Sequence, residues 1–104
     1  MLYNIEQIKE RIVLSMQHHE VIKVVLFGSF ARGTADDGSD IDLMIAADTN
    51  KRFLDRIDDL QDLYDVLPGT GLDILVYTPE ELDNMTGNPF ITSIMKEGIT
   101  LYER

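Results

Sequence analysis

The sequence has 104 residues, of which 44% are hydrophobic and 27% are charged, and its formal net charge is −10. This balance excludes a disordered chain, and the absence of cysteine excludes disulfides and thiolate metal sites. No run approaches the ~20 apolar residues that a membrane helix needs and no signal peptide opens the chain, so we expect a cytoplasmic protein without a membrane segment.

The strong negative charge also restricts the partners. Proteins that bind nucleic acid directly carry a basic surface, so direct nucleic-acid binding is disfavoured. An acidic surface suits a basic protein partner, and it still allows a nucleotide that is held through metal ions. The length corresponds to one domain, which we place at residues 1–104.

The beginning of the chain carries a helix signal followed by a strand signal. Asn4 and Gln7 have the spacing of a capping box, which predicts a helix from about residue 5 to residue 17. The run 22–27 is β-branched and almost entirely apolar, as in a buried strand. Gly28 ends this strand.

The middle of the chain predicts a second strand between two helical segments. Residues 29–32 favour a short helix before a polar loop, and the apolar run 41–46 predicts a buried strand. A longer helix is expected over 51–67, because apolar residues recur there on one face of an α-helix. These residues are Phe53, Ile57, Leu60, Tyr64 and Leu67.

The last part of the chain predicts a third strand, helices and a short edge strand. The third strand is expected over 72–77, and the run 78–81 (Thr-Pro-Glu-Glu) is typical of a helix start. A final helix over 90–97 and an edge strand over 99–102 complete the chain. This order predicts an α/β (α+β) protein with helices packed on a small mixed β-sheet.

Two aspartates, Asp40 and Asp42, stand at the head of the second predicted strand. Because side chains alternate along a strand, both carboxylates are expected to project from the same face. Two close negative charges raise each other's pKa unless a cation lies between them, and Mg²⁺ favours a pair of carboxylates together with substrate phosphates. The alternative is that Asp40 begins a turn and that Asp42 is a solvated strand end.

A third aspartate, Asp73, lies within the third predicted strand. Burial of an isolated charged carboxylate is unfavourable by several kcal/mol, so Asp73 is expected at an exposed strand end or facing a metal ion. If the third strand lies beside the first two, Asp73 completes a cluster with Asp40 and Asp42. Such a cluster fits the two-metal mechanism of nucleotidyl transfer. The alternative is a strand-end or helix-paired aspartate.

Gly28 and Ser29 follow the first predicted strand directly. Glycine lets the backbone approach a ligand closely, free backbone amides bind phosphate, and the Ser29 hydroxyl would add a donor. Arg32 is placed to reach a phosphate or to pair with one of the aspartates. The alternatives are an ordinary turn at Gly28 and Ser29, and a helix cap at Arg32.

Together, the segments 28–33 (Gly-Ser-Phe-Ala-Arg-Gly) and 39–43 (Ser-Asp-Ile-Asp-Leu) resemble the signature of the polymerase-β-like nucleotidyltransferase superfamily, in which Gly-Ser precedes Asp-x-Asp. The Gly-Ser-x-Ala-Arg-Gly form and the length are similar, more narrowly, to the minimal nucleotidyltransferase (MNT) group. The resemblance implies the polymerase-β-like nucleotidyltransferase fold. The additional domain with which larger relatives hold the base and the acceptor is not part of this sequence, so a partner is expected to supply part of the site.

The resemblance also implies a reaction and a set of site residues. Ser29 would help to bind the triphosphate of ATP, Asp40 and Asp42 would ligate a pair of Mg²⁺ ions, and Asp73 would be the third carboxylate. The reaction would transfer AMP from ATP to a hydroxyl group of a partner protein. Members of the group often act as antitoxins of HEPN-family toxins, which makes such a toxin the expected partner. The alternative is a non-catalytic acidic antitoxin that neutralises its partner by complex formation.

Overall fold

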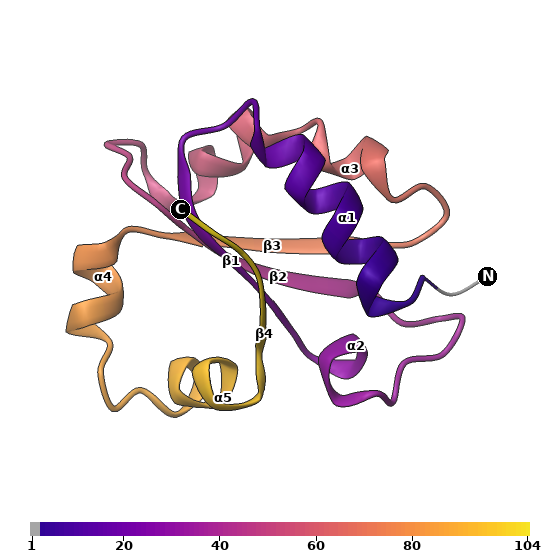
Figure 1. Ribbon diagram of the computed structural model, residues 1–104. Coiled ribbons are helices and arrows are strands. Elements are labelled where there is room, and N and C mark those ends of the chain that lie inside the picture. Colours follow the sequence, from indigo (N-terminus) through magenta and orange to yellow (C-terminus); the bar gives the residue numbers. More distant parts are fainter. Residues whose placement is uncertain (1–2) are drawn as a thin grey trace.

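The computed structural model describes residues 3–104 as a four-stranded sheet with helices on both faces (Figure 1). The strand order is β3-β2-β1-β4, in which β2 and β3 are parallel and the other neighbours are antiparallel. The strands are β1 (Val21–Phe27), β2 (Ile41–Ala47), β3 (Leu72–Tyr77) and β4 (Ile99–Glu103). The predicted mixed sheet is thereby confirmed, with β4 as an edge strand.

Five α-helices and one 3₁₀ helix connect these strands in the described part of the chain. They are α1 (Ile5–Met16), α2 (Ser29–Arg32), the 3₁₀ helix η1 (Phe53–Leu60), α3 (Leu63–Val66), α4 (Pro79–Asn84) and α5 (Pro89–Glu97). Capping boxes begin α1 at Asn4 and α4 at Thr78, as the sequence predicts. Within residues 3–104, no helix combines the length and the apolar character that a bilayer-spanning segment requires.

The predicted continuous helix over 51–67 is wrong. The segment winds as η1 and then as the short α3, and a 3₁₀ helix repeats every three residues rather than every 3.6. Arg56 therefore turns inward instead of Ile57, and Leu63 turns inward instead of Tyr64. Phe53 and Tyr64, both expected in the core, are 37% and 39% exposed.

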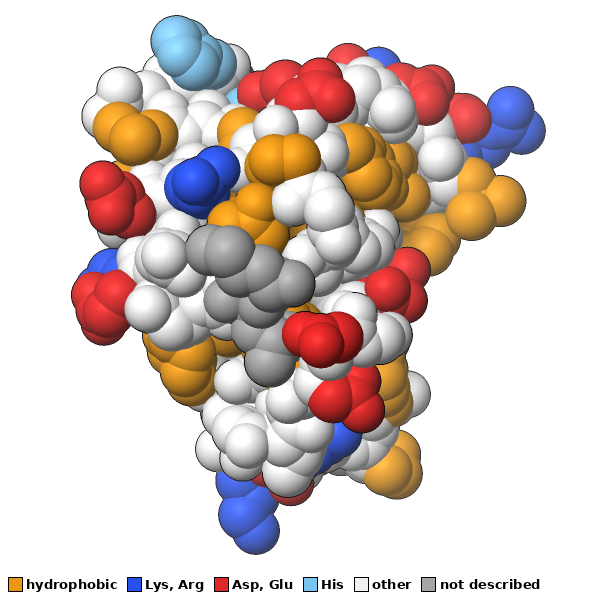
Figure 2. Space-filling model, turned by 90° about the vertical axis from the view of Figure 1, so that its right-hand side faces the viewer, with side chains coloured by type: hydrophobic (Ala, Val, Ile, Leu, Met, Phe, Trp, Pro, Cys, Tyr) orange, Lys and Arg blue, Asp and Glu red, His pale blue; other side chains and the backbone are white. Residues whose placement is uncertain are grey.

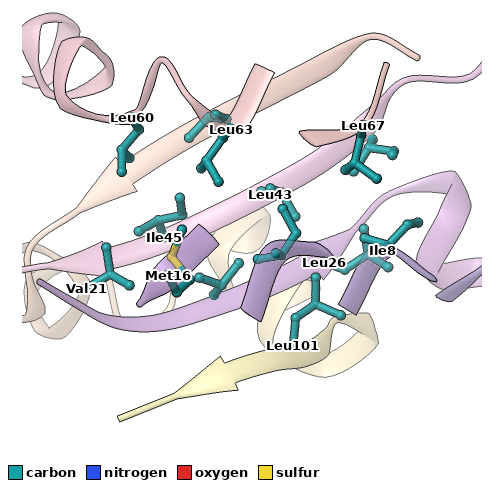
Figure 3. Packing of buried hydrophobic residues seen from close by; sticks show 14 of the residues in the cluster. Ile8, Met16, Val21, Leu26, Leu43, Ile45, Leu60, Leu63, Leu67 and Leu101 are labelled. Atoms are coloured by element: carbon teal, nitrogen blue, oxygen red, sulfur yellow. The ribbon is translucent and has the colours of Figure 1, made fainter. Parts of the chain in front are cut away.

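The main hydrophobic core lies between the sheet and the layer formed by α1, η1 and α3. Figure 3 shows side chains from these helices and from the strands pointing toward one another. The labelled residues are Ile8, Met16, Val21, Leu26, Leu43, Ile45, Leu60, Leu63, Leu67 and Leu101. Burial of this apolar surface provides the main driving force for folding.

A second, smaller core lies on the opposite face of the sheet, where α5 packs. It contains Val25 of β1, Met44 of β2, and Ile91 and Ile94 of α5. Because side chains alternate along a strand, Asp42 projects to the same face as Met44. The functional residues of β2 therefore lie on the α5 face of the sheet.

Candidate active site

Asp42 and Asp73 lie directly beside each other on neighbouring strands. The register pairs Asp42 of β2 with Asp73 of β3 on one side and with Phe27 of β1 on the other. Residues opposite each other in a sheet share one face, so these three side chains form a row across the sheet. The sequence leaves open whether the third strand lies beside the first two. β3 lies beside β2, which brings Asp73 next to Asp42, but it does not lie beside β1.

Asp40 lies one residue before β2 and contacts the residue that precedes β3. The Ile41 amide donates to the carbonyl oxygen of Gly71 over 2.9 Å, which ties the two strand starts together. The Asp40 carboxylate lies so close to the Cα of Gly71 that a Cβ at this position would overlap it. The sequence alone does not single out Gly71, and its only signal is a glycine placed directly before the third strand.

Gly28 stands in the same relation to Asp42. Its φ of +76° lies in the left-handed region that favours glycine, and a Cβ here would overlap Oδ2 of Asp42. Ser29 follows as the first residue of α2. Gly28 is thereby placed against the carboxylate of Asp42, with Ser29 next to it in the chain, at the end of the sheet where β2 and β3 begin.

The charge at this end of the molecule is strongly negative. Burial first, and then the nearby carboxylates of Asp73 and Asp40, raise the pKa of Asp42 from 3.8 to about 6, while Arg32 opposes them. Figure 2 looks at this end of the molecule, and exposed acidic side chains are spread over it. A cation is the natural complement of such a group of carboxylates.

The carboxylates do not form a complete protein-built metal site. Among residues 3–104, no three His, Asp or Glu side chains are grouped closely enough to hold a metal ion. Mg²⁺ is usually bound by one or two carboxylates, with substrate phosphates and water as its other ligands. The adjacent Asp42 and Asp73, with Asp40 in electrostatic range, fit a metal ion that arrives with a nucleotide. That these residues bind Mg²⁺ stays a prediction.

Arg32 forms an ion pair with α5 rather than with an aspartate. Its Nη1 lies 3.9 Å from Oε2 of Glu97, and both side chains are about half exposed. An exposed pair at this distance contributes little free energy, so the guanidinium can exchange Glu97 for a phosphate. The positive charge of Arg32 already acts on Asp42, because it partly opposes the rise in the pKa of that carboxyl group.

Substitution of Gly28 by alanine is expected to abolish nucleotide-dependent activity, because the new methyl group must displace the Asp42 carboxylate. Gly87→Ala is the matched control: Gly87 has a similar φ of +89°, but no atom lies within 4 Å of the position that a Cβ would take there. Both substitutions are expected to lower the free energy of unfolding by about 1 kcal/mol through backbone strain. Urea unfolding and an activity assay separate the two effects, and equal activity of the two variants would contradict the close contact at Gly28.

Substitution of Asp42 by asparagine is expected to stabilise the metal-free protein at high pH. The pKa of Asp42 is higher in the folded state, so its contribution to stability is present below about pH 3.8 and is lost as the pH rises through about 6. The full shift corresponds to ~3 kcal/mol, which solvent screening reduces to about 1 kcal/mol for this partly exposed group. Urea unfolding with a chelator present should show that Asp42→Asn raises the free energy of unfolding at pH 8 and raises it by a smaller amount at pH 5. An equal increase in the free energy of unfolding at both pH values would contradict the raised pKa of Asp42.

Comparison with known proteins adds a family to this geometry. The family model described as polymerase beta, nucleotidyltransferase, matches residues 6–104. This chain belongs to that family. The mixed sheet with its helices is thus the fold of a polymerase beta nucleotidyltransferase domain, as the resemblance implies, while the roles of the Gly-Ser turn and of the aspartates stay predictions.

Two relatives of this nucleotidyltransferase come from Methanocaldococcus jannaschii, and both are named as proposed protein adenylyltransferases. MJ1305 is 35% identical over 89 residues, which cover 82% of this chain and 60% of the relative. MJ0435 is 35% identical over 74 residues, which cover 71% of this chain and 78% of the relative. The chain therefore spans less than two thirds of the length of MJ1305.

Solved structures confirm the fold of the nucleotidyltransferase domain. A toxin–antitoxin structure with AMP-PNP is 19% identical with a TM-score of 0.65, over 92% of this chain and 73% of that chain. A proposed nucleotidyltransferase from Sulfolobus solfataricus is 22% identical with a TM-score of 0.62, over 95% of this chain and 79% of that chain. The toxin–antitoxin MntA-HepT is 16% identical with a TM-score of 0.58, over 95% and 73%.

Proposed function

We propose that this chain is a Mg²⁺-dependent protein adenylyltransferase, which transfers AMP from ATP to a hydroxyl group of a partner protein. The observation that carries the proposal is the pairing of Asp42 with Asp73 beside Gly28, in a chain of the nucleotidyltransferase family. The relatives named as proposed protein adenylyltransferases support a protein as the acceptor.

The residues of the site serve phosphate binding, metal binding and proton transfer in this reaction. Gly28 and Ser29 bind the triphosphate, while Asp40, Asp42 and Asp73 would hold a pair of Mg²⁺ ions, which neutralise phosphate charge when bound. The acceptor oxygen attacks the α-phosphorus, the bond from that phosphorus to the bridging oxygen breaks, and pyrophosphate leaves. Asp73 lies in the row on the open α5 face and receives the hydroxyl proton of the acceptor.

The proposed partner is a HEPN-family toxin, for which this chain serves as the antitoxin. Toxin–antitoxin pairs among the structural neighbours support this partner. The net charge of −10 supports a basic surface on the partner, which long-range attraction would bring to the acidic end of this molecule.

The experiment uses ATP labelled at either the α- or the γ-phosphate. The chain is mixed with Mg²⁺, labelled ATP and the protein encoded beside it. We expect the partner to acquire the α-label but not the γ-label, with release of pyrophosphate. Transfer of the γ-label would show phosphoryl transfer instead, and transfer of neither label would contradict the proposed activity.

The second candidate function is an acidic antitoxin that neutralises its partner by binding alone, and the charge of −10 favours it. A variant with Asp40, Asp42 and Asp73 all replaced by asparagine separates the two functions. If this variant still neutralises the toxin at equal concentration, binding is sufficient. If neutralisation is lost while the complex still forms, transfer is required.

A further inference from the structure

Phe90 is a large hydrophobic residue that the fold leaves half exposed in the first turn of α5. It is 49% exposed and packs on Phe27, with ring centroids 5.9 Å apart and ring planes at 88°. In an edge-to-face pair, the edge of one ring meets one face of the other. Whichever ring contributes the edge, Phe27 leaves at least one face of the Phe90 ring uncovered.

The side of α5 that carries Phe90 faces the candidate active site. Phe90 and Glu97 are seven residues apart, which places them on the same side of the helix. Glu97 reaches Arg32 of α2, and Phe90 reaches Phe27 of β1. Phe27 immediately precedes Gly28 and Ser29 in the chain, and Arg32 follows them. This side of α5 therefore lies over the turn that is proposed to bind the triphosphate.

The aromatic pair is also continuous with the carboxylate row. Phe27 is directly opposite Asp42 on the neighbouring strand, and Asp42 is directly beside Asp73. On this face of the sheet, the exposed Phe90 ring of α5 is thus followed by Phe27 and then by carboxylates, with Gly28 next to them. A nucleotide with bound cations offers the complementary pair of chemical groups, since a flat aromatic base is joined to a charged phosphate chain.

We propose that Phe90 stacks on the base of the nucleoside triphosphate whose phosphates bind at Gly28 and Ser29. This inference rests on the proposed function and adds to it a base-binding residue within the chain itself. Stacking on an aromatic side chain is tolerant of sequence, because every base has a π-face. The ring therefore favours any nucleoside triphosphate over the bare triphosphate chain and discriminates weakly between ATP and GTP.

The experiment measures the binding of two ligands, ATP and inorganic tripolyphosphate, in the presence of Mg²⁺. The variants are Phe90→Leu, which keeps an apolar side chain without a ring, and Phe90→Trp, which keeps a ring. Since the chain has no tryptophan, Phe90→Trp also provides a single fluorescent reporter. The control is Met95→Leu, at an equally exposed residue (52%) of α5 that lines the groove toward α4.

We expect Phe90→Leu to raise the Kd for ATP about tenfold and to leave the Kd for tripolyphosphate unchanged. Phe90→Trp should retain ATP affinity, and its fluorescence should be quenched by ATP but not by tripolyphosphate. Met95→Leu should change neither Kd.

Three results for Phe90→Leu would overturn the inference while the proposed function stands. They are an unchanged Kd for ATP, an equal rise in the Kd for ATP and for tripolyphosphate, and a loss of partner binding with ATP binding intact. Failure of the unmodified chain to bind either ligand would overturn the nucleotide site itself, and the base-stacking role with it.

Discussion

Replacement of Asp42 by asparagine is expected to reduce transfer of AMP to the partner by about 10³-fold or more. Asparagine keeps the shape of the side chain but removes the negative charge that would hold the metal ions. Metal ions supply several kcal/mol of transition-state stabilisation in such reactions, and each 1.4 kcal/mol corresponds to a tenfold change in rate. Asp42 lies at the centre of the row, between Phe27 and Asp73.

The matched control for this prediction is Asp48→Asn. Asp48 follows the other end of β2, where it is exposed and distant from Gly28 in the strand register. Its replacement should leave the transfer rate within a factor of about two, since surface substitutions rarely disturb a fold. The rate is measured from single-turnover labelling of the partner at saturating ATP. If Asp42→Asn retained activity within tenfold of the unmodified chain, the proposed metal-binding role would be wrong.

The largest effect on stability is expected from Arg56→Leu, which should lower the free energy of unfolding by about 3 kcal/mol. Arg56 is only 8% exposed and joins three parts of the fold. Two of its hydrogen bonds go to the Glu81 carboxylate, from Nη1 to Oε1 at 2.6 Å and from Nη2 to Oε2 at 3.1 Å. The other two go to backbone carbonyl oxygens, from Nη1 to Val76 at 3.0 Å and from Nε to Lys51 at 2.9 Å. Leucine removes every one of these donors.

The contact with Arg56 also changes the pKa of the Glu81 carboxyl group. Hydrogen bonds from Arg56 first, and then from the backbone amide of Thr78, lower the pKa of Glu81 from 4.5 to about 2. The stability that this pair contributes is therefore present above pH 4.5 and is lost as the pH falls toward 2. Because Glu81 is partly exposed, solvent screening makes this pH-dependent part smaller than the full effect of Arg56→Leu.

Urea unfolding at pH 7 tests the prediction, with two further variants. Arg56→Lys keeps the charge without the two-pronged contact and should fall between the unmodified chain and Arg56→Leu. Arg52→Leu removes an arginine whose side chain is 92% exposed, and it should change the unfolding free energy by less than about 0.5 kcal/mol. Equal losses for Arg52→Leu and Arg56→Leu would show that Arg56 has no special structural role.

The strands and the helix starts could be predicted from the sequence, because each has a strong local cause. The apolar run 41–46 and the capping pair Thr78 and Glu81 act through residues that are near in sequence, and β2 and α4 begin where expected. The candidate site could be predicted mainly from the pattern of the three aspartates Asp40, Asp42 and Asp73. The structure places Asp42 beside Asp73, as the predicted order of elements allows.

The features that were missed depend on contacts between distant residues. The inward position of Arg56 on η1 is stabilised by hydrogen bonds to Val76 and Glu81, which lie 20 and 25 residues further along the chain. No local pattern marks Gly71, because its function depends on the Asp40 carboxylate that the parallel pairing of β2 and β3 brings against it. The position of Phe90 over the site likewise follows from the packing of α5 on the sheet.

The central claim is that the site formed by Gly28, Ser29 and the three aspartates transfers AMP to a partner protein. The most direct measurement is the intact mass of the partner after incubation with this chain, ATP and Mg²⁺, followed by peptide mapping. We predict a mass increase equal to one or more AMP groups, located on a hydroxyl side chain, and none with Asp42→Asn. An unchanged mass of a partner that is nevertheless neutralised, or the addition of phosphate alone, would contradict the claim.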